Sequence, residues 1–382
     1  MRADNPHAAP TGAPNAAPVL AGLTGLRFLA ATWVLLFHAM PRAALPNRAA
    51  AFSASGYLAV GLFFVLSGFI LAHVYGDAAA HDRLPRRAFW RARFARVYPA
   101  YAAALVVSFP LTLRGWWSSA PIVHSPTGVL VSTPLMLQAW VPGWGAGWNA
   151  PGWSLSVEAF FYLLFPFIAP PLMRRGFVAA CAIGISCVGL TVAATQLIEP
   201  TTVNGSWWLL RALSHFATAW TPLLRLPEFV LGICAARVWQ LRPLPAQWRA
   251  PAATAATVAL LAAAMSTVSA PQGLRGTAAV SAASAVLISA LASAPRSWLG
   301  HPAMVRLGNA SYSLYLFHAT LNAYFLAIAN RLVSPAWAGS WSAFAVFTVV
   351  AVGCALLIHD RVELPARQLL RGRAGSTRAP SW

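Results

Sequence analysis

The chain has 382 residues, of which 58% are hydrophobic and only 9% are charged. A soluble domain usually carries about 25% charged residues, so this composition excludes a water-soluble globular protein and indicates a polytopic membrane protein. The formal net charge is +19, and all 27 basic residues are Arg. Because these Arg cluster between apolar runs, they indicate membrane topology, and we expect membrane lipids but no nucleic acid as partners.

Residues 1–19 are rich in Ala, Pro and Asn, and we predict that they form a disordered cytoplasmic tail. They lack the basic segment and short apolar core of a signal peptide, so the first apolar run is expected to remain as a membrane helix. A membrane domain is predicted over 20–367, and a basic cytoplasmic tail is predicted over 368–382.

The apolar runs predict an all-α fold with about ten transmembrane helices, because a helix needs roughly 20 apolar residues to cross a bilayer. The shorter stretch 127–141 is broken by Pro134 and is predicted to be a re-entrant or interfacial segment. The predicted spans are 23–40, 57–76, 97–113, 153–173, 177–197, 222–240, 252–270, 276–294, 308–330 and 339–359.

The distribution of Arg predicts the orientation of these spans. The densest cluster lies in 77–96, and basic residues mark the cytoplasmic side of membrane proteins. Alternating the spans from that loop places both termini and most of the other Arg in the cytoplasm. The outer loops 114–152 and 198–221 are instead rich in Trp, which predicts either an interfacial aromatic belt or a stacking platform for sugar rings.

The first predicted span carries two titratable side chains, Arg27 and His38, within LRFLAATWVLLFHA. Their separation of 11 residues corresponds to three helical turns plus roughly 20°, so both side chains lie on one face, about 16 Å apart along the axis. Ionisable groups inside a membrane are costly and commonly functional. The alternative is structural, with an Arg that reaches the interface and a His bonded to a neighbouring carbonyl.

Glu158 and His318 are two further ionisable residues inside predicted spans. Span 153–173 enters from the outer side, so Glu158 and His38 are both predicted to lie in the outer half of the membrane, where the two could meet. A carboxylate beside an imidazole fixes its tautomer and stabilises its protonated form, as a general base requires. His318 follows Arg306 by 12 residues, which places the two on different faces. It is either a second functional imidazole or a structural His bonded to another helix.

The segment FWRARFARVYPAY, from Phe89 to Tyr101, places Arg93 and Arg96 at the inner mouth of span 97–113. Two guanidiniums at this spacing suit a phosphate-rich ligand. Ordinary anchoring at the cytoplasmic interface is the alternative.

Several other polar groups are interpreted as structural. Arg225 and Glu228 are three residues apart and are predicted to form an ion pair. Ser67 does not lie in a GxSxG motif, so with Gly68 it is predicted to allow close helix packing. The four Cys lie in apolar runs without metal-ligand spacing, so neither a metal site nor a disulfide is expected.

A series of sequence blocks resembles, in the same order, those of the acyltransferase-3 family of integral membrane O-acyltransferases. GLRFLAATWVLLFHA resembles the first helix of the family, whose mark is an Arg and a His separated by ten residues. GLFFVLSGFIL resembles the second-helix block, RFARVYPAY the Arg-x-x-Arg-x-x-Pro-x-Tyr block, and WSLSVEAFFYLLFP the Trp-Ser-Leu block. LRLPEFVLG, SYSLYLFH and VELPAR also fit, so the resemblance covers residues 22–367.

The resemblance implies transfer of an acyl group, usually acetyl, from an acyl-CoA co-substrate to a hydroxyl, without a metal. The expected protein lies in the inner (plasma) membrane, takes acyl-CoA from the cytoplasm, and acylates a cell-envelope glycan, a lipid-linked sugar or another extracytoplasmic acceptor. The esterase-like domain that some members carry is not expected. The residues that match the family's blocks are His38 and Glu158 as catalytic candidates, Arg27, Arg93 and Arg96 as donor-binding candidates, and His318, Glu363, Trp153 and Tyr98 as further candidates.

A proton-coupled transporter of a glycan precursor or small metabolite is the alternative function. In that case His38, Glu158 and His318 would form a proton relay across the membrane. The chain shows no pair of inverted halves with broken helices, which favours the enzyme. The acceptor, the length of the acyl chain, the oligomeric state, and whether His38 acts as a general base or transiently carries the acyl group stay open at this point.

Overall fold

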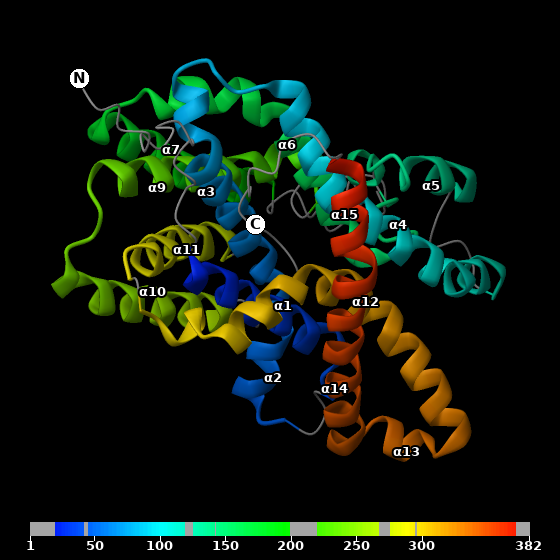
Figure 1. Ribbon diagram of the computed structural model, residues 1–382. Helices are drawn as coiled ribbons and strands as arrows, with labels where there is room; N and C mark the ends of the chain where they lie inside the picture. Colours follow the sequence, from blue (N-terminus) through cyan, green and yellow to red (C-terminus); the bar gives the residue numbers. More distant parts are fainter. Residues whose placement is uncertain are drawn as a thin grey trace, which may run out of the picture.

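The computed structural model describes residues 20–41, 45–118, 125–141, 143–198, 220–266, 276–294 and 296–371. This described part of the chain is built from helices and contains no strand (Figure 1). The predicted all-α fold is therefore confirmed. The predicted tail over 1–19 lies outside the described residues, as do residues 372–382 of the predicted C-terminal tail. Residues 368–371, the start of that C-terminal tail, belong to helix α15 (Leu364–Arg371).

Each predicted span overlaps one long helix. These helices are α1 (Ala21–Ala39), α3 (Ala59–Ala80), α4 (Arg86–Ser118), α6 (Trp153–Met173), α7 (Phe177–Ile198), α9 (Pro222–Leu241), α10 (Ala246–Ser266), α11 (Thr277–Ala292), α12 (Pro302–Leu332) and α14 (Trp341–Ile358). Short helical segments connect them: α2 (Asn47–Ala54), η2 (Gly56–Leu58), α5 (Pro126–Ser132), η3 (Gln138–Trp140), η4 (Ala150–Gly152), η7 (Trp298–Gly300), α13 (Pro335–Ala338) and η8 (His359–Glu363). The stretch 127–141 forms only α5, a turn and η3, so it does not form a full span, as predicted.

Seven stretches of the described chain are long and apolar enough to cross a membrane, judged by length and composition. They include α1, α3, α4, α6, α7, α10 and α14. Helix α11 has only 16 residues, and α9 carries the charged residues Arg225 and Glu228. The chain is therefore a multi-pass membrane protein, while the number of its spans and the side of its termini stay predictions.

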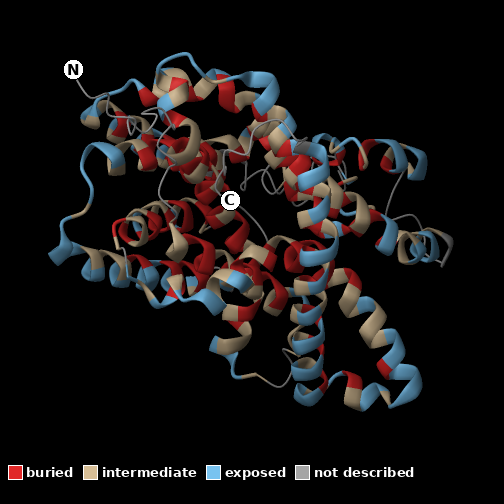
Figure 2. Ribbon diagram, in the orientation of Figure 1, coloured by how far each residue is buried: buried red, intermediate tan, exposed pale blue. Residues whose placement is uncertain are grey.

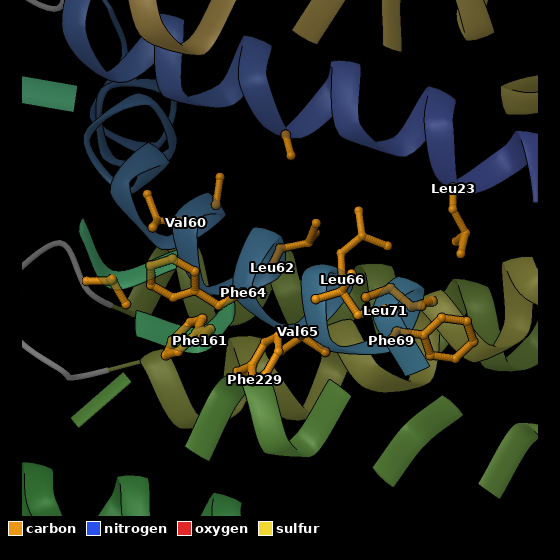
Figure 3. Close-up of a cluster of buried hydrophobic side chains, with 14 of the residues drawn as sticks. Leu23, Val60, Leu62, Phe64, Val65, Leu66, Phe69, Leu71, Phe161 and Phe229 are labelled. Carbon is orange, nitrogen blue, oxygen red and sulfur yellow. The ribbon is translucent and has the colours of Figure 1, made fainter. Parts of the chain in front are cut away.

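Helix α3 forms the centre of the packed core. Buried residues concentrate where α1, α3, α9 and α11 come together, whereas α10, α13 and α14 present many exposed residues (Figure 2). The side chains of α3 point both toward Leu23 on α1 and toward Phe229 on α9 (Figure 3). Phe229 also stacks on Phe161 of α6, with ring centroids 4.7 Å apart. A helix covered on all sides has to be apolar around its whole circumference, which explains the uninterrupted run in its sequence.

Close contact between α3 and α9 depends on two glycines. A Cβ atom at Gly68 would lie 2.1 Å from the carbonyl oxygen of Phe229, and one at Gly232 would lie 2.0 Å from that of Val65. Small residues let two membrane helices bring their backbones into contact. The predicted packing role of Gly68 is therefore confirmed, and α3 and α9 together form a rigid wall behind the cavity described next.

Candidate functional site

Helices α1, α3, α4, α6 and α12 enclose a cavity of about 120 Å³ in the middle of the fold. Most of its lining is apolar, but four charged side chains reach it: Arg27, Arg93, Arg96 and Glu158. Hydroxyl groups complete the polar part of the wall, from Ser67, Tyr162, Ser311, Tyr312 and Tyr315. Three guanidiniums facing one carboxylate leave the cavity with an excess of positive charge, which favours an anionic ligand.

Arg93 is the most deeply buried of the three arginines, with 7% of its surface exposed. Its terminal nitrogen donates a hydrogen bond to the Tyr75 hydroxyl at 3.2 Å, and its guanidinium lies over the rings of Tyr75 and Phe89. Its Nε is buried and has no hydrogen-bond partner among the described residues. A buried N–H without a partner is costly, so this donor marks a place where a ligand oxygen would be stabilised.

Glu158 is held on the opposite wall by two hydroxyl groups. Ser67 on α3 donates to its Oε1 at 3.2 Å, and Tyr162, one turn later on α6, donates a short hydrogen bond to the same oxygen. The Tyr162 backbone is tied in turn to α4, because the indole N–H of Trp90 donates to its carbonyl at 3.1 Å. These bonds hold the carboxylate at the cavity that the arginines also line, and they differ from the predicted meeting of Glu158 with His38.

The residue that does meet His38 is His318. Nε2 of His318 lies 3.0 Å from Nδ1 of His38, and the two rings have centroids 4.8 Å apart. Helix α1 packs along α12 over much of its length, which brings the two imidazoles together across 280 positions of sequence. His318 is completely buried, whereas His38 is exposed. The prediction that a carboxylate would orient His38 is thus corrected, because a second imidazole takes that position.

The hydrogen bonds of the pair assign the tautomers. Nδ1 of His318 lies 2.7 Å from the carbonyl oxygen of Tyr315, which can only accept, so Nδ1 carries the proton. Nε2 of a neutral His318 is then an acceptor, and Nδ1–H of His38 donates to it and to the carbonyl oxygen of Val34, also at 3.0 Å. With the proton on Nδ1, the lone pair of the His38 ring lies on Nε2. This is the atom that could accept a proton from a substrate.

Tyr315 connects the cavity with the histidine pair. Its side chain lines the cavity, and its hydroxyl forms a 2.7 Å hydrogen bond with Ser154 at the start of α6. Its carbonyl oxygen accepts the hydrogen bond from His318, about one helical turn further along α12. Arg27 lines the cavity, while His38 lies 11 residues further along α1. The shared face predicted for these two residues is therefore the face that α1 turns toward α12.

Five predicted candidates do not line the cavity: the two histidines of the pair, His38 and His318, and also Glu363, Trp153 and Tyr98. Glu363 is 1% exposed and accepts hydrogen bonds from His359 at 3.0 Å and Arg367 at 3.5 Å, although it still interacts electrostatically with Arg96. Trp153 stacks on Trp220 with centroids 5.8 Å apart, and Tyr98 stacks on Phe94 at 4.6 Å. Glu363, Trp153 and Tyr98 support the helices that carry the site and do not reach into it.

Sequence analysis missed the hydroxyl-bearing residues of the cavity, among them both partners of Glu158, and it missed the pairing of the histidines. Tyr162 follows Glu158 by four positions on one helix, a spacing that brings side chains together, so this contact could have been inferred. Ser67 was assigned to packing only, and its bond to Glu158 depends on which face of α3 meets α6. The predicted ion pair of Arg225 with Glu228 is confirmed, at 2.9 Å.

Comparison with known proteins agrees with the resemblance of the sequence blocks to an acyltransferase family. The family model described as "Acyltransferase domain" matches residues 20–360. The chain is 31% identical to the acyltransferase MdmB of Streptomyces mycarofaciens over 94% of this chain and 95% of that protein.

Two further relatives match over shorter stretches. The putative peptidoglycan O-acetyltransferase YrhL of Bacillus subtilis is 24% identical over 47% of this chain and 28% of its own length. The O-acetyltransferase OatA of Staphylococcus aureus is 24% identical over 41% of this chain and 26% of its own length. No solved structure matches the chain significantly.

Proposed function

Because the chain belongs to the membrane acyltransferase family whose domain model spans residues 20–360, we propose that it transfers an acyl group, most simply acetyl, from cytoplasmic acyl-CoA to a hydroxyl of an extracytoplasmic acceptor. A glycan of the cell envelope or a lipid-linked sugar is the proposed acceptor. The names of the two O-acetyltransferase relatives support acetyl as the group. Membership of the family decides between the two functions left open by the sequence, in favour of the enzyme and against the transporter.

The positively charged cavity is the proposed binding site for the donor. Arg27, Arg93 and Arg96 line it, and guanidiniums bind phosphate oxygens through charge-assisted hydrogen bonds. The unpartnered Nε of Arg93 supports this assignment. The cavity volume of about 120 Å³ is small beside the roughly 300–1,000 Å³ of a typical ligand pocket. It therefore has room only for a slender part of the donor, so we place the pantetheine arm and the adjoining diphosphate at the arginines and the adenosine outside the cavity on the cytoplasmic side.

The hydrogen-bonded histidine pair is the observation that carries the proposed chemistry. In the proposed reaction, Nε2 of His38 accepts the proton of the acceptor hydroxyl while the hydroxyl oxygen attacks the thioester carbonyl carbon. The carbon–sulfur bond then breaks, and the CoA thiolate takes the proton back from Nε2, so the imidazole is regenerated. His318 accepts from Nδ1–H of His38 throughout, which stabilises the imidazolium formed in between. Glu158 accepts from Tyr162 and Ser67 and so keeps these two side chains of the donor cavity in place.

A transfer assay with labelled acetyl-CoA tests this proposal. The full chain is reconstituted in lipid nanodiscs, and label is followed into a panel of envelope glycans and methyl glycosides. We expect full transfer by the wild-type protein and by His81→Ala, whose imidazole is exposed, and transfer reduced about 100- to 10,000-fold in His38→Ala. Full transfer by His38→Ala would contradict the role of this residue. In cells, deletion of the gene should remove the mass of an acetyl group from one class of envelope glycan.

A further inference from the structure

A second cavity lies between α4, α12 and the turns that precede α6. Its volume is about 310 Å³. Polar side chains line it from three directions, namely Ser108 and Thr112 on α4, Thr320 on α12 and Asn149 in the turn. Two indoles, Trp116 and Trp148, also line it, and no charged side chain is among its lining residues. The donor cavity is positively charged, so the two cavities suit ligands of different chemistry.

Asn149 is the feature that points to a ligand. It is 7% exposed, and neither its Nδ2 nor its Oδ1 has a hydrogen-bond partner among the described residues. Its backbone is in the left-handed region, with φ at +43°, a conformation that Asn adopts more readily than most residues with a side chain. Burying a complete amide without partners is costly. A ligand with a donor and an acceptor close together would satisfy both atoms of this side chain.

The rest of the lining defines what that ligand should be. Ser108 donates its hydroxyl proton to the carbonyl oxygen of Ala104, and Thr112 donates to that of Ser108. The two hydroxyl oxygens can therefore still accept hydrogen bonds in the cavity. The indole of Trp148 is fixed by its own bond to the carbonyl oxygen of Leu105 at 3.1 Å. The cavity therefore offers hydroxyl oxygens that accept hydrogen bonds, one amide and two aromatic rings, and it has no charged group. This combination suits a neutral, polyhydroxylated ring.

We propose that this cavity binds a neutral pyranose ring of the acceptor, with the Asn149 amide bonded to two adjacent hydroxyls. The inference rests on the proposed function, because it names the acceptor class of that same reaction. Ala319 and Thr320 of α12 line the cavity directly after His318. One residue turns a helix by about 100°, so the ring would lie at the level of the histidine pair but beside it. The cavity thus selects a sugar unit next to the one that carries the reacting hydroxyl.

Equilibrium binding tests this proposal without any need for catalysis. The probes are the methyl glycosides of glucose, galactose, mannose and N-acetylglucosamine, titrated by calorimetry into the full chain in nanodiscs, with glucose 6-phosphate as the charged comparison. We expect at least one neutral glycoside to bind in a manner that depends on Asn149, and we expect any binding of the phosphate ester, which the arginine-lined cavity can accept, to be independent of Asn149. Asn149→Gly removes the amide but accepts the left-handed backbone, and it should weaken binding at least tenfold. Asn330→Ala, an exposed Asn on α12, is the matched control and should bind as wild type.

A second variant protects the test against misfolding. Thr320→Val keeps the shape of a buried side chain and removes one hydroxyl from the opposite wall, and it should weaken binding several-fold. If no methyl glycoside binds the wild-type chain, or if neither variant weakens binding, the sugar site is refuted. Acyl transfer by the wild type without such an effect would leave the proposed function standing and remove only this site. If glycosides bind in a manner that depends on Asn149 but the protein transfers no acyl group, the sugar site stands and the proposed acyltransferase function is refuted.

Discussion

Replacement of His318 by Leu tests how the histidine pair works. His318 is completely buried and does not reach the donor cavity, so in the proposed mechanism it acts only through His38, as a positioning residue. The proton on Nδ1 of His38 has two acceptors, Nε2 of His318 and the carbonyl oxygen of Val34, each at 3.0 Å. In His318→Leu the carbonyl remains. We therefore expect the tautomer of His38 to survive and the stabilisation of its protonated form to be reduced.

The size of the effect follows from the change in charge during the reaction. When His38 accepts a proton it becomes a cation, and a hydrogen bond to a charged group contributes about 1.5–3 kcal/mol. Since about 1.4 kcal/mol corresponds to a tenfold change in rate, His318→Leu should lower kcat roughly 10- to 100-fold. Loss of the base in His38→Ala should cost more, about 100- to 10,000-fold. His318→Gln places an amide oxygen near the former Nε2, so it should recover most of the rate.

The measurement is steady-state acetyl transfer in nanodiscs, with kcat and the KM for acetyl-CoA determined separately for wild type, His318→Leu, His318→Gln and His81→Gln. The KM should stay within about threefold in all four proteins, because His318 does not line the donor cavity. Thermal unfolding of each variant checks that the fold is intact. A folded His318→Leu protein with the wild-type kcat would refute the reasoning. So would equal, complete loss of activity in the Leu and Gln variants.

Three further predictions concern the donor cavity and the helix packing. Arg96→Ala should raise the KM for acetyl-CoA roughly 10- to 100-fold with a smaller change in kcat, because a charge-assisted bond to phosphate is lost. Direct titration of CoA should show the Kd raised by the same factor. Glu158→Gln keeps an oxygen for Tyr162 but removes the charge, and it should lower kcat about tenfold without loss of protein in the membrane, which quantitative immunoblotting checks. Gly232→Ala forces a Cβ to within 2.0 Å of a backbone oxygen on α3 and should destabilise the fold by about 1–3 kcal/mol, which a lower melting temperature would show. Gly189 has open space around it, so the control variant Gly189→Ala should melt at the wild-type temperature.

The helices were predictable because membrane helices depend on local composition. An apolar run of about 20 residues has few alternatives to a helix inside a bilayer, and each predicted span overlaps one helix of the structure. The two exceptions to a simple apolar pattern are informative. Helix α9 carries Arg225 and Glu228, which pair with each other at 2.9 Å and are buried. Helix α12 is amphipathic along part of its length because it presents Ser311, Tyr312 and Tyr315 to the cavity.

The convergence of the arginines was only partly predictable. Arg93 and Arg96 lie one turn apart on one helix, so their common position follows from spacing alone. That Arg27 joins them depends on the packing of α1 beside α3 and α12, which a single sequence does not specify. The resemblance to the family pointed to all three residues as donor-binding candidates. The structure places Arg27 with the other arginines, near the end of the site opposite to His38.

The histidine pair shows where reasoning from spacing ends. Helical periodicity says which side chains share a face, and it correctly put Arg27 and His38 on one face and His318 on a different face from Arg306. It does not say which faces of different helices meet. Glu158 and His318 were both available as partners for His38, and electrostatics favoured the carboxylate. The carboxylate of Glu158 instead accepts from the hydroxyls of Ser67 and Tyr162 and lines the donor cavity, and the neutral imidazole of His318 accepts from His38.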